Sequence, residues 1–328
     1  MKSSFVLVKL PLSIACLVLC SAVAIAQDPE LVRHFDYDAK APLELKTVGQ
    51  QKRGEATIYD ITYASPKGGV VPAYLVVPTN GKGPFAAVIW GHWYWTNSDM
   101  RNRKEFLDEA VALASAGVVS LLTDGPVARP GYVVDNTPMS EKRSAEEVQQ
   151  VIDMRRGADL LLARKDVDPK RLAYVGHSYN ASIGAIVSGV DRRFKAFVLM
   201  AGPISDEVGY KTGGYEKFRQ QVGPEKFDAF MASHAYLDQG KYVSHAAPAV
   251  VFLQYATKED FMTPDVAREY EKIVSEPKRF KLYDSPHALN AEARRDRIAF
   301  LTEQLKLKPL PANVVDSIPD LYQPPRPN

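Results

Sequence analysis

The sequence predicts an α/β protein with a mostly parallel central sheet that helices cover on both faces. Short apolar runs alternate with amphipathic segments along most of the chain. The later apolar runs are continuous rather than alternating, which is typical of parallel strands buried on both faces. The chain contains no internal repeat and no low-complexity block, so the alternation describes one layered domain.

The expected strands are short and rich in β-branched and aromatic residues. The first two, over residues 57–64 and 70–78, are joined by the Gly-containing segment 65–69 and predict a hairpin. The other expected strands cover residues 85–90, 118–123, 171–175, 194–200, 249–254 and 279–283.

The expected helices fall between these strands. A long one over residues 144–164 begins with Ser144 and Glu147, whose hydroxyl and carboxylate can satisfy free amides at a helix start. Val148, Val151 and Leu162 fit its buried stripe. Further helices are expected over residues 102–116, 178–189 and 264–275, with a last one ending near residue 305.

Two segments interrupt the alternation and divide the chain. Residues 203–245 lie between two expected strands and place Phe227, Phe230, Met231 and His234 on one helix face. They form either a small cap over a site or a plain surface excursion. The main domain is expected to cover residues 27–308. The tail, residues 309–328, holds six prolines and is expected to pack as an extended strap or to stay mobile.

The first 26 residues have the pattern of a signal peptide. Two lysines precede an apolar run over residues 10–24, and Ala24-Ile25-Ala26 supplies a small-x-small cleavage site. The run of about 15 residues is short of the roughly 20 that a membrane-spanning helix needs. We therefore expect cleavage after Ala26, export to the periplasm or the medium, and no stable membrane anchor afterwards.

Composition then excludes several classes of function. Both cysteines, Cys16 and Cys20, lie in the signal segment, so residues 27–328 have no thiol for a disulfide, a thiolate nucleophile or a metal ligand. The same residues carry 39 basic and 39 acidic side chains, because the first 26 hold two lysines and no acid. This balance gives no basic surface for nucleic acid or for a membrane.

One motif carries nucleophile chemistry. Gly176-His177-Ser178-Tyr179-Asn180 follows the expected strand 171–175 and opens a helix. A sharp strand-to-helix turn exposes the serine hydroxyl at the end of the sheet, which makes Ser178 the candidate nucleophile. Asn180 departs from the Gly or Ala usual at its position, so a larger side chain must find room there.

Residues 55–305 resemble the dienelactone-hydrolase-like branch of the α/β-hydrolases, and are also similar to the prolyl-oligopeptidase catalytic domain and to acetyl xylan esterases. The resemblance rests on the order of three motifs: residues 176–180, then Asp260-Phe261-Met262-Thr263-Pro264, then Ser285-Pro286-His287. It implies the α/β-hydrolase fold and a triad of Ser178, Asp260 and His287, with no cofactor.

The chemistry of acyl transfer agrees with these assignments. A serine hydroxyl needs a base to take its proton, and a carboxylate must orient that base and stabilise its cation. His287, in a turn after an expected strand, is the best base in the chain. Glu259 and Asp265 are rival acids, but the Asp-x-x-Thr-Pro spacing that begins at Asp260 matches the family.

The oxyanion hole requires two amide donors. One is expected to be the amide of Tyr179, directly after the nucleophile. The second is expected from the loop Gly91-His92-Trp93-Tyr94-Trp95, where Trp93 replaces a usual Gly, and the choice between Trp93 and Tyr94 stays open. Trp95 and His177 are candidate pocket residues, although two of the three loop aromatics can equally pack the loop.

The remaining histidines predict no metal site. His34, His234 and His245 have no metal-ligand spacing, and no His-Glu-x-x-His motif occurs, so we expect neither a metal nor another cofactor.

The sequence thus predicts an exported serine hydrolase that cleaves a small-molecule or glycan carboxylic ester. A serine peptidase or amidase is the alternative enzyme, although only about 30 residues precede the first hairpin to form a gate. A non-catalytic ligand-binding protein on a hydrolase scaffold is the alternative outside enzymes, and Asn180 and Trp93 are the residues that favour it.

Overall fold

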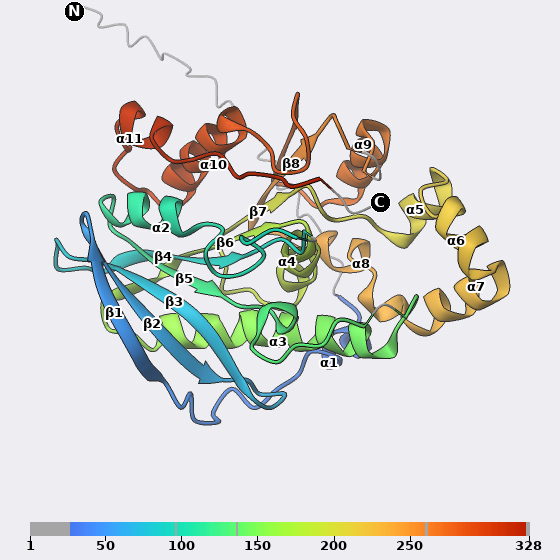
Figure 1. Cartoon of the computed structure of the whole chain (residues 1–328), viewed down its shortest axis with the longest axis horizontal. Coiled ribbons are helices and arrows are strands. Elements are labelled where there is room, and N and C mark those ends of the chain that lie inside the picture. The colour runs from blue at the N-terminus through green and yellow to red at the C-terminus, as the bar shows by residue number, and fades with distance from the viewer. Residues whose placement is uncertain (1–26, 96, 136, 260–261, 326–328) are drawn as a thin grey trace, which may run out of the picture.

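The computed structural model describes residues 27–95, 97–135, 137–259 and 262–325, which are built around one sheet (Figure 1). Strand order across the sheet is β1-β2-β3-β5-β4-β6-β7-β8-β9. The pairs from β1 to β5 are antiparallel, and every pair from β5 to β9 is parallel, as the sequence predicts. The strands are β1 (Lys46–Arg53), β2 (Ala56–Ala64), β3 (Val70–Pro78), β4 (Phe85–Gly91), β5 (Val118–Thr123), β6 (Val167–His177), β7 (Ala196–Met200), β8 (Val250–Ala256) and β9 (Lys278–Tyr283).

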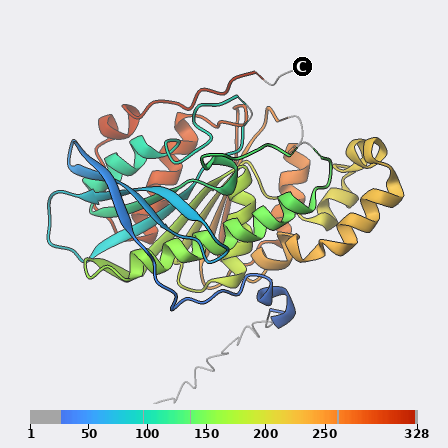
Figure 2. The ribbon, with the colours of Figure 1, turned by 60° about the horizontal axis from the view of Figure 1, so that its bottom comes forward.

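Helices cover both faces of the sheet, as Figure 2 shows for α3 below it and α2 and α10 above it. The face that α3 covers also carries α4, α8 and α9. Their bounds are α3 (Glu141–Leu162), α4 (Tyr179–Val190), α8 (Gly240–Val243) and α9 (Pro264–Ile273). The opposite face carries α2 (Leu107–Ala114), α10 (Ala291–Gln304) and α11 (Ala312–Asp316).

The central strands are apolar throughout because each faces two cores. In β4, Ala87 and Ile89 contribute to the core under α3 and α4. Their neighbours Ala86, Val88 and Trp90 contribute to the core under α2 and α10. Successive side chains of a strand point to opposite faces, so a strand covered on both sides must be apolar at every position.

One strand and one helix start differ notably from the sequence prediction. Strand β1 was not expected, because its sequence KTVGQQKR shows no apolar alternation; it is an edge strand with every residue exposed. Helix α3 begins at Glu141 rather than at Ser144, because Ser140 has the extended backbone of a cap and its hydroxyl accepts from the amide of Arg143. Ser144 is instead buried within the helix.

The excursion between β7 and β8 is helical. It holds α5 (Asp206–Lys211), α6 (Glu216–Val222), α7 (Pro224–Ser233), the 3-10 helix η2 (Ala235–Leu237) and α8, and it packs against α9 and α4. Phe227 is buried, and Phe230 stacks on His234 with ring centroids 3.9 Å apart. His234 Nε2 also lies 3.0 Å from Glu141 at the start of α3, so this histidine packs the excursion onto the domain.

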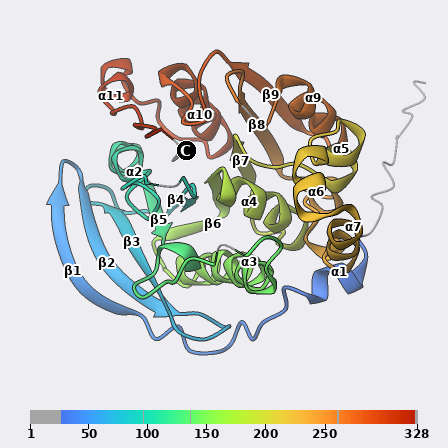
Figure 3. The same ribbon diagram turned by 45° about the vertical axis from the view of Figure 1, so that its right-hand side comes forward.

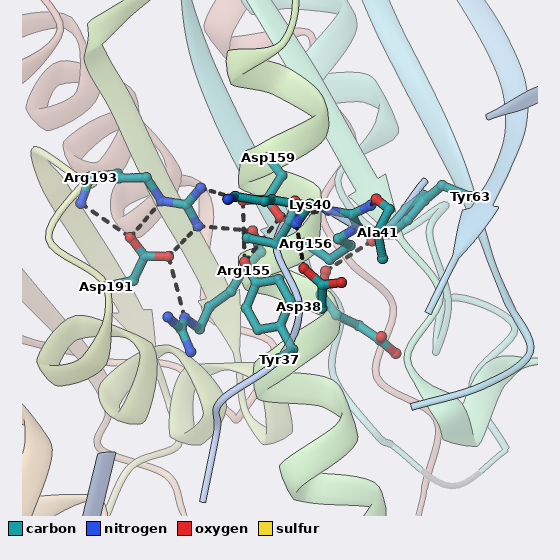
Figure 4. Close-up of polar contacts among 12 residues, drawn as sticks. Tyr37, Asp38, Lys40, Ala41, Tyr63, Arg155, Arg156, Asp159, Asp191 and Arg193 are labelled. Atoms are coloured by element: carbon teal, nitrogen blue, oxygen red, sulfur yellow. Dashed lines mark hydrogen bonds and ion pairs between the residues drawn. The ribbon is translucent and has the colours of Figure 1, made fainter. Parts of the chain in front are cut away.

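Arginines of α3 fasten the segment that joins α1 (Pro29–Arg33) to β1 (Figure 4). Arg155 donates to the carbonyl of Phe35 across 2.6 Å, and Arg156 donates to that of Ala39 across 2.9 Å. The hydroxyl of Tyr37 donates to Asp159 of the same helix across 3.0 Å. The carbonyls of Phe35 and Ala39 are therefore satisfied on α3, whereas the carbonyl of Leu43 accepts from the amide of Ala64 in β2 across 2.8 Å.

The predicted signal segment, residues 1–26, lies outside the described residues. In the ranges that the structure describes, no helix is long and apolar enough to cross a membrane.

Candidate active site

The candidate site lies where the parallel strands end. Strand β4 ends at Gly91, β6 at His177 and β9 at Tyr283, and each is followed by one of the loops predicted to carry chemistry. Figure 3 looks toward this edge of the sheet, with the ends of β4 and β6 between α2 and α4. Ligands of open α/β sheets bind outside the carboxyl ends of the strands, which makes this edge the expected location.

Ser178 occupies a strained turn between β6 and α4. Its backbone has φ 53° and ψ −112°, a conformation that residues other than glycine rarely adopt. Its amide donates to the carbonyl of Met200 across 2.7 Å, which fixes the turn to the next strand. A Cβ atom on Gly176 would lie 2.1 Å from the carbonyl oxygen of Asn180, so only glycine fits before the turn. Ser178 itself is partly exposed at the amino end of α4.

Asn180 fits because the loop after β4 leaves room for it. A Cβ atom on Gly91, the last residue of β4, would lie 2.4 Å from the Cβ of Asn180. The absence of a side chain at position 91 therefore makes room for Asn180. The fully buried amide of Asn180 donates to the carbonyl of His92 across 2.6 Å and accepts from Gln150 across 2.8 Å. The departure from the family pattern is therefore a satisfied anchor for the loop after β4.

His287 is paired with a carboxylate from the loop after β8. Its Nδ1 atom contacts Oε1 of Glu259, and only 2% of either side chain is exposed. Glu259 was the rival to Asp260 in the sequence. Asp260 lies outside the described residues, and Asp265 lies in the first turn of α9. The described partner of the candidate base is thus Glu259.

The structure separates the two candidates for the second oxyanion donor. The amide of Trp93 donates to Oε2 of Glu105 across 2.6 Å, so that amide is already satisfied. Of the two candidates that the sequence left open, this contact favours Tyr94 over Trp93. The amide of Tyr179 opens α4, where the first amides have no partner within their own helix.

His92 fixes the loop after β4 as a neutral imidazole. The amide of Gly125 donates to its Nε2 atom across 3.0 Å, so Nε2 is unprotonated. Its Nδ1 atom therefore carries the hydrogen and donates to the carbonyl of Trp93 across 2.6 Å. Burial lowers the pKa of His92 to about 4, against the opposing effect of the hydrogen bond to Trp93.

The aromatic residues of this loop mostly pack it. Trp93 is fully buried and Trp95 is 7% exposed, with ring centroids 5.6 Å apart, while Tyr94 is half-buried. Trp95 was a candidate for the pocket or for packing the loop, and its burial agrees with packing. Its ring lies 4.9 Å from that of His287.

His177 is fully buried against the loop that carries His287. Its Nδ1 atom lies 2.6 Å from Oε1 of Glu105, and its Nε2 atom lies 2.9 Å from the carbonyl of His287. It borders a cavity of about 170 Å³ whose lining also includes Glu105, Asn290, Arg294 and Leu321.

The C-terminal tail reaches the same region in an extended form. The carbonyl of Pro324 accepts from the indole of Trp95 across 2.8 Å, and Gln323 accepts from the amide of Ala288 across 2.8 Å. Leu321 packs on the cluster of Trp93, Trp95 and Ala288. After α11, the described part of the tail is the extended strap that was one of two expectations, and it contacts the loop after β4 and the loop of His287.

The sequence assigned no role to three polar residues of this edge. Glu105 lies in a charged stretch before α2, His92 follows a strand end, and Gln323 lies in the proline-rich tail. Only the position of His92, directly after a strand end at the catalytic edge, was a usable signal. Among the described residues, no group of three or more His, Cys, Asp or Glu side chains is placed to hold a metal ion.

Comparison with solved structures confirms the α/β-hydrolase fold. The acetyl xylan esterase of Paenibacillus sp. R4 has a TM-score of 0.67 at 18% identity, over 85% of this chain and 96% of that one. Acetyl xylan esterase 1 of Thermoanaerobacterium sp. JW/SL YS485 has a TM-score of 0.66 at 15% identity, over 85% and 95%. The glucuronoyl esterase of Solibacter usitatus has a TM-score of 0.59 at 14% identity, over 84% and 91%.

Sequence comparison gives a more distant likeness. No protein-family profile matches the chain. A Bacillus subtilis (strain 168) protein named "Putative hydrolase YtaP" is 22% identical over 200 residues, which cover 56% of this chain and 65% of that protein. The match thus spans just under two thirds of the length of this relative.

Proposed function

We propose that the protein hydrolyses carboxylic esters through an acyl-enzyme formed on Ser178. The observation that carries the proposal is the strained turn that presents this serine at the carboxyl edge of the sheet, with φ 53° at a residue that is not glycine. Strain of this kind persists where function requires a fixed geometry. The fold is shared with proteins named as acetyl xylan and glucuronoyl esterases, which supports esters over other substrates.

In the proposed reaction, the hydroxyl oxygen of Ser178 attacks the ester carbonyl carbon while Nε2 of His287 takes the hydroxyl proton. The alcohol leaves with that proton, and the acyl group stays on the serine. His287 then takes a proton from water, the resulting hydroxide attacks the acyl-enzyme, and the carboxylic acid leaves as Ser178 regains its proton.

Two further groups stabilise charge during these steps. Glu259, which contacts Nδ1 of His287, holds the ring in the tautomer that leaves Nε2 open to accept and stabilises the cation that follows. The amides of Tyr179 and Tyr94 donate to the oxyanion. Neither Asn180 nor Trp93 argues for a non-catalytic scaffold, because both departures are satisfied by contacts within the fold.

We further propose export, with cleavage after Ala26, and an environmental substrate such as an acetylated carbohydrate or a small carboxylic ester. Export is tested by producing the full chain with its own leader in a bacterial host. A periplasmic or secreted product that begins at Gln27 is expected, and an uncleaved cytoplasmic product would contradict it.

Ester hydrolysis is tested with Ser178→Ala and the matched control Ser182→Ala, which removes a hydroxyl one turn further along α4. The wild type and Ser182→Ala are expected to hydrolyse p-nitrophenyl acetate, to release acetate from acetylated xylan and to be labelled by a fluorophosphonate. Ser178→Ala is expected to lose both activities and the label. Equal activity in Ser178→Ala, or absence of labelling in the wild type, would contradict the mechanism.

A further inference from the structure

A second histidine–carboxylate pair lies beside the candidate triad, and the proposed reaction does not use it. Oε1 of Glu105 lies 2.6 Å from Nδ1 of His177, and the two side chains are 2% and 0% exposed. The other oxygen of the same carboxylate, Oε2, accepts from the amide of Trp93 across 2.6 Å. One carboxylate thus joins the nucleophile elbow to the loop after β4.

The same pair reaches the third catalytic loop. Nε2 of His177 lies 2.9 Å from the carbonyl oxygen of His287. A carbonyl only accepts, so Nε2 carries a hydrogen and donates it. The imidazole rings of His177 and His287 are stacked, with centroids 5.2 Å apart, and the ring of Trp93 stacks on both, with centroids at 5.1 Å and 6.2 Å.

The hydrogen bonds of the pair can be satisfied with or without a charge. Burial raises the pKa of Glu105, while the nearby His177 lowers it. A proton on Nδ1 gives an imidazolium and a carboxylate, and a proton on the carboxyl gives two neutral groups. Either arrangement keeps the bond to Nδ1, the donation from Nε2 and the acceptance from Trp93. What the pair supplies is therefore geometry.

We propose that Glu105 and His177 are positioning residues that set the loop after β4 and the catalytic histidine loop at fixed places relative to Ser178. This inference rests on the proposed function, since it assigns the pair to the same site. Groups that come from three different strands must be held to within about 0.5 Å for catalysis, and buried hydrogen bonds to their backbones do this. The pair bonds to the backbone of Trp93 and of His287, so it acts through the two loops that carry them.

The test compares two buried carboxylates that are four positions apart in the sequence, Glu105 just before α2 and Glu109 within it. Glu105→Leu leaves the amide of Trp93 and Nδ1 of His177 without their partner. Glu109→Leu is the matched control, because Glu109 is also buried but bonds to Arg297 of α10 and to neither catalytic loop. The third variant, Glu105→Gln, keeps an oxygen for Trp93 and a donor for His177. Each is assayed for Tm, and for kcat and KM on p-nitrophenyl acetate well below its Tm.

Glu105→Leu is expected to lower kcat by about 10- to 100-fold with little change in KM. A shift of about 1 Å in the position of a catalytic group can lower the rate by up to about 100-fold. Glu109→Leu is expected to lose Tm but to keep kcat within about threefold, and Glu105→Gln to keep kcat within about threefold. The proposal is overturned if Glu105→Leu keeps kcat, if Glu109→Leu loses as much, or if Glu105→Gln loses more than about tenfold.

His177→Phe decides the matter if Glu105→Leu does not fold. Phenylalanine keeps a ring in the stack but makes neither hydrogen bond, so the same fall in kcat is expected. A wild-type kcat in this variant would overturn the proposal. Failure of the inference is distinguishable from failure of the proposed function, because fluorophosphonate labelling of the wild type at Ser178 tests only the latter.

Discussion

The side-chain amide of Asn180 donates to the carbonyl oxygen of His92 across 2.6 Å, and so ties the first turn of α4 to the loop after β4. The space for this contact comes from Gly91, where a Cβ atom would lie 2.4 Å from the Cβ of Asn180. Glycine at position 91 thus makes room for the larger side chain in the elbow. The small residue lies on the strand, and the larger one lies in the elbow.

Replacing Asn180 by glycine is expected to lower both stability and activity. The change removes two buried hydrogen bonds and leaves the carbonyl of His92 and the amide of Gln150 without this partner, at a cost of about 1–3 kcal/mol each. It also frees the loop that carries the candidate oxyanion donor. Urea unfolding and kcat/KM on p-nitrophenyl acetate measure the two effects, and an unchanged kcat/KM would show that the anchor does not serve catalysis.

A second substitution isolates the contact between the two residues. Gly91→Ala alone is expected to destabilise the protein, because its Cβ overlaps Asn180. The double variant Gly91→Ala/Asn180→Gly has no such overlap. Its loss of unfolding free energy should therefore be smaller than the sum of the losses in the two single variants, by at least about 1 kcal/mol. Additive losses in urea unfolding would mean that the two positions are independent.

The sequence predicted the sheet well because its strands are buried on both faces. Residues such as Val88 and Ile89 have no polar neighbour within β4, and this continuous apolar pattern fixes both the strand and its parallel class. Strand β1 was missed for the opposite reason. Every residue in Lys46–Arg53 is exposed, so this segment is a strand only because it pairs with β2. Backbone pairing at an exposed edge requires no particular residue types, so the sequence of the segment did not indicate a strand.

The site was predictable where chemistry depends on a local turn. Ser178 and His287 each follow a strand end, which a linear pattern records. The hydrogen bonds of Glu105 join residues that are 12 and 72 positions apart, and no local pattern encodes such contacts. The acid beside His287 was ambiguous for a similar reason, because Glu259 and Asp260 are adjacent and loop conformation decides which one faces the ring.

Glu259→Gln is expected to lower kcat by about 10³- to 10⁴-fold at nearly constant KM. The amide fits the space but cannot stabilise the imidazolium of His287 and does not hold the required tautomer. The matched comparisons are Asp260→Asn, at the acid that the sequence favoured, and Asp265→Asn, in the first turn of α9. If Asp260→Asn causes the deep loss and Glu259→Gln does not, the sequence assignment is right and the Glu259 contact is not the catalytic one.

The neutral state of His92 predicts that stability falls on acidification. Its pKa is about 4 in the fold, below the ordinary 6.5, because the ring is buried. The unfolded chain therefore binds the extra proton first, and folding loses free energy as the pH drops from 6.5 toward 4, by up to about 3 kcal/mol. In His92→Asn, which retains a donor for the carbonyl of Trp93, this loss is absent. The stability advantage of the wild type in urea unfolding should thus shrink between pH 7 and pH 4. An advantage that is constant over this range would show that burial does not hold His92 neutral in the fold.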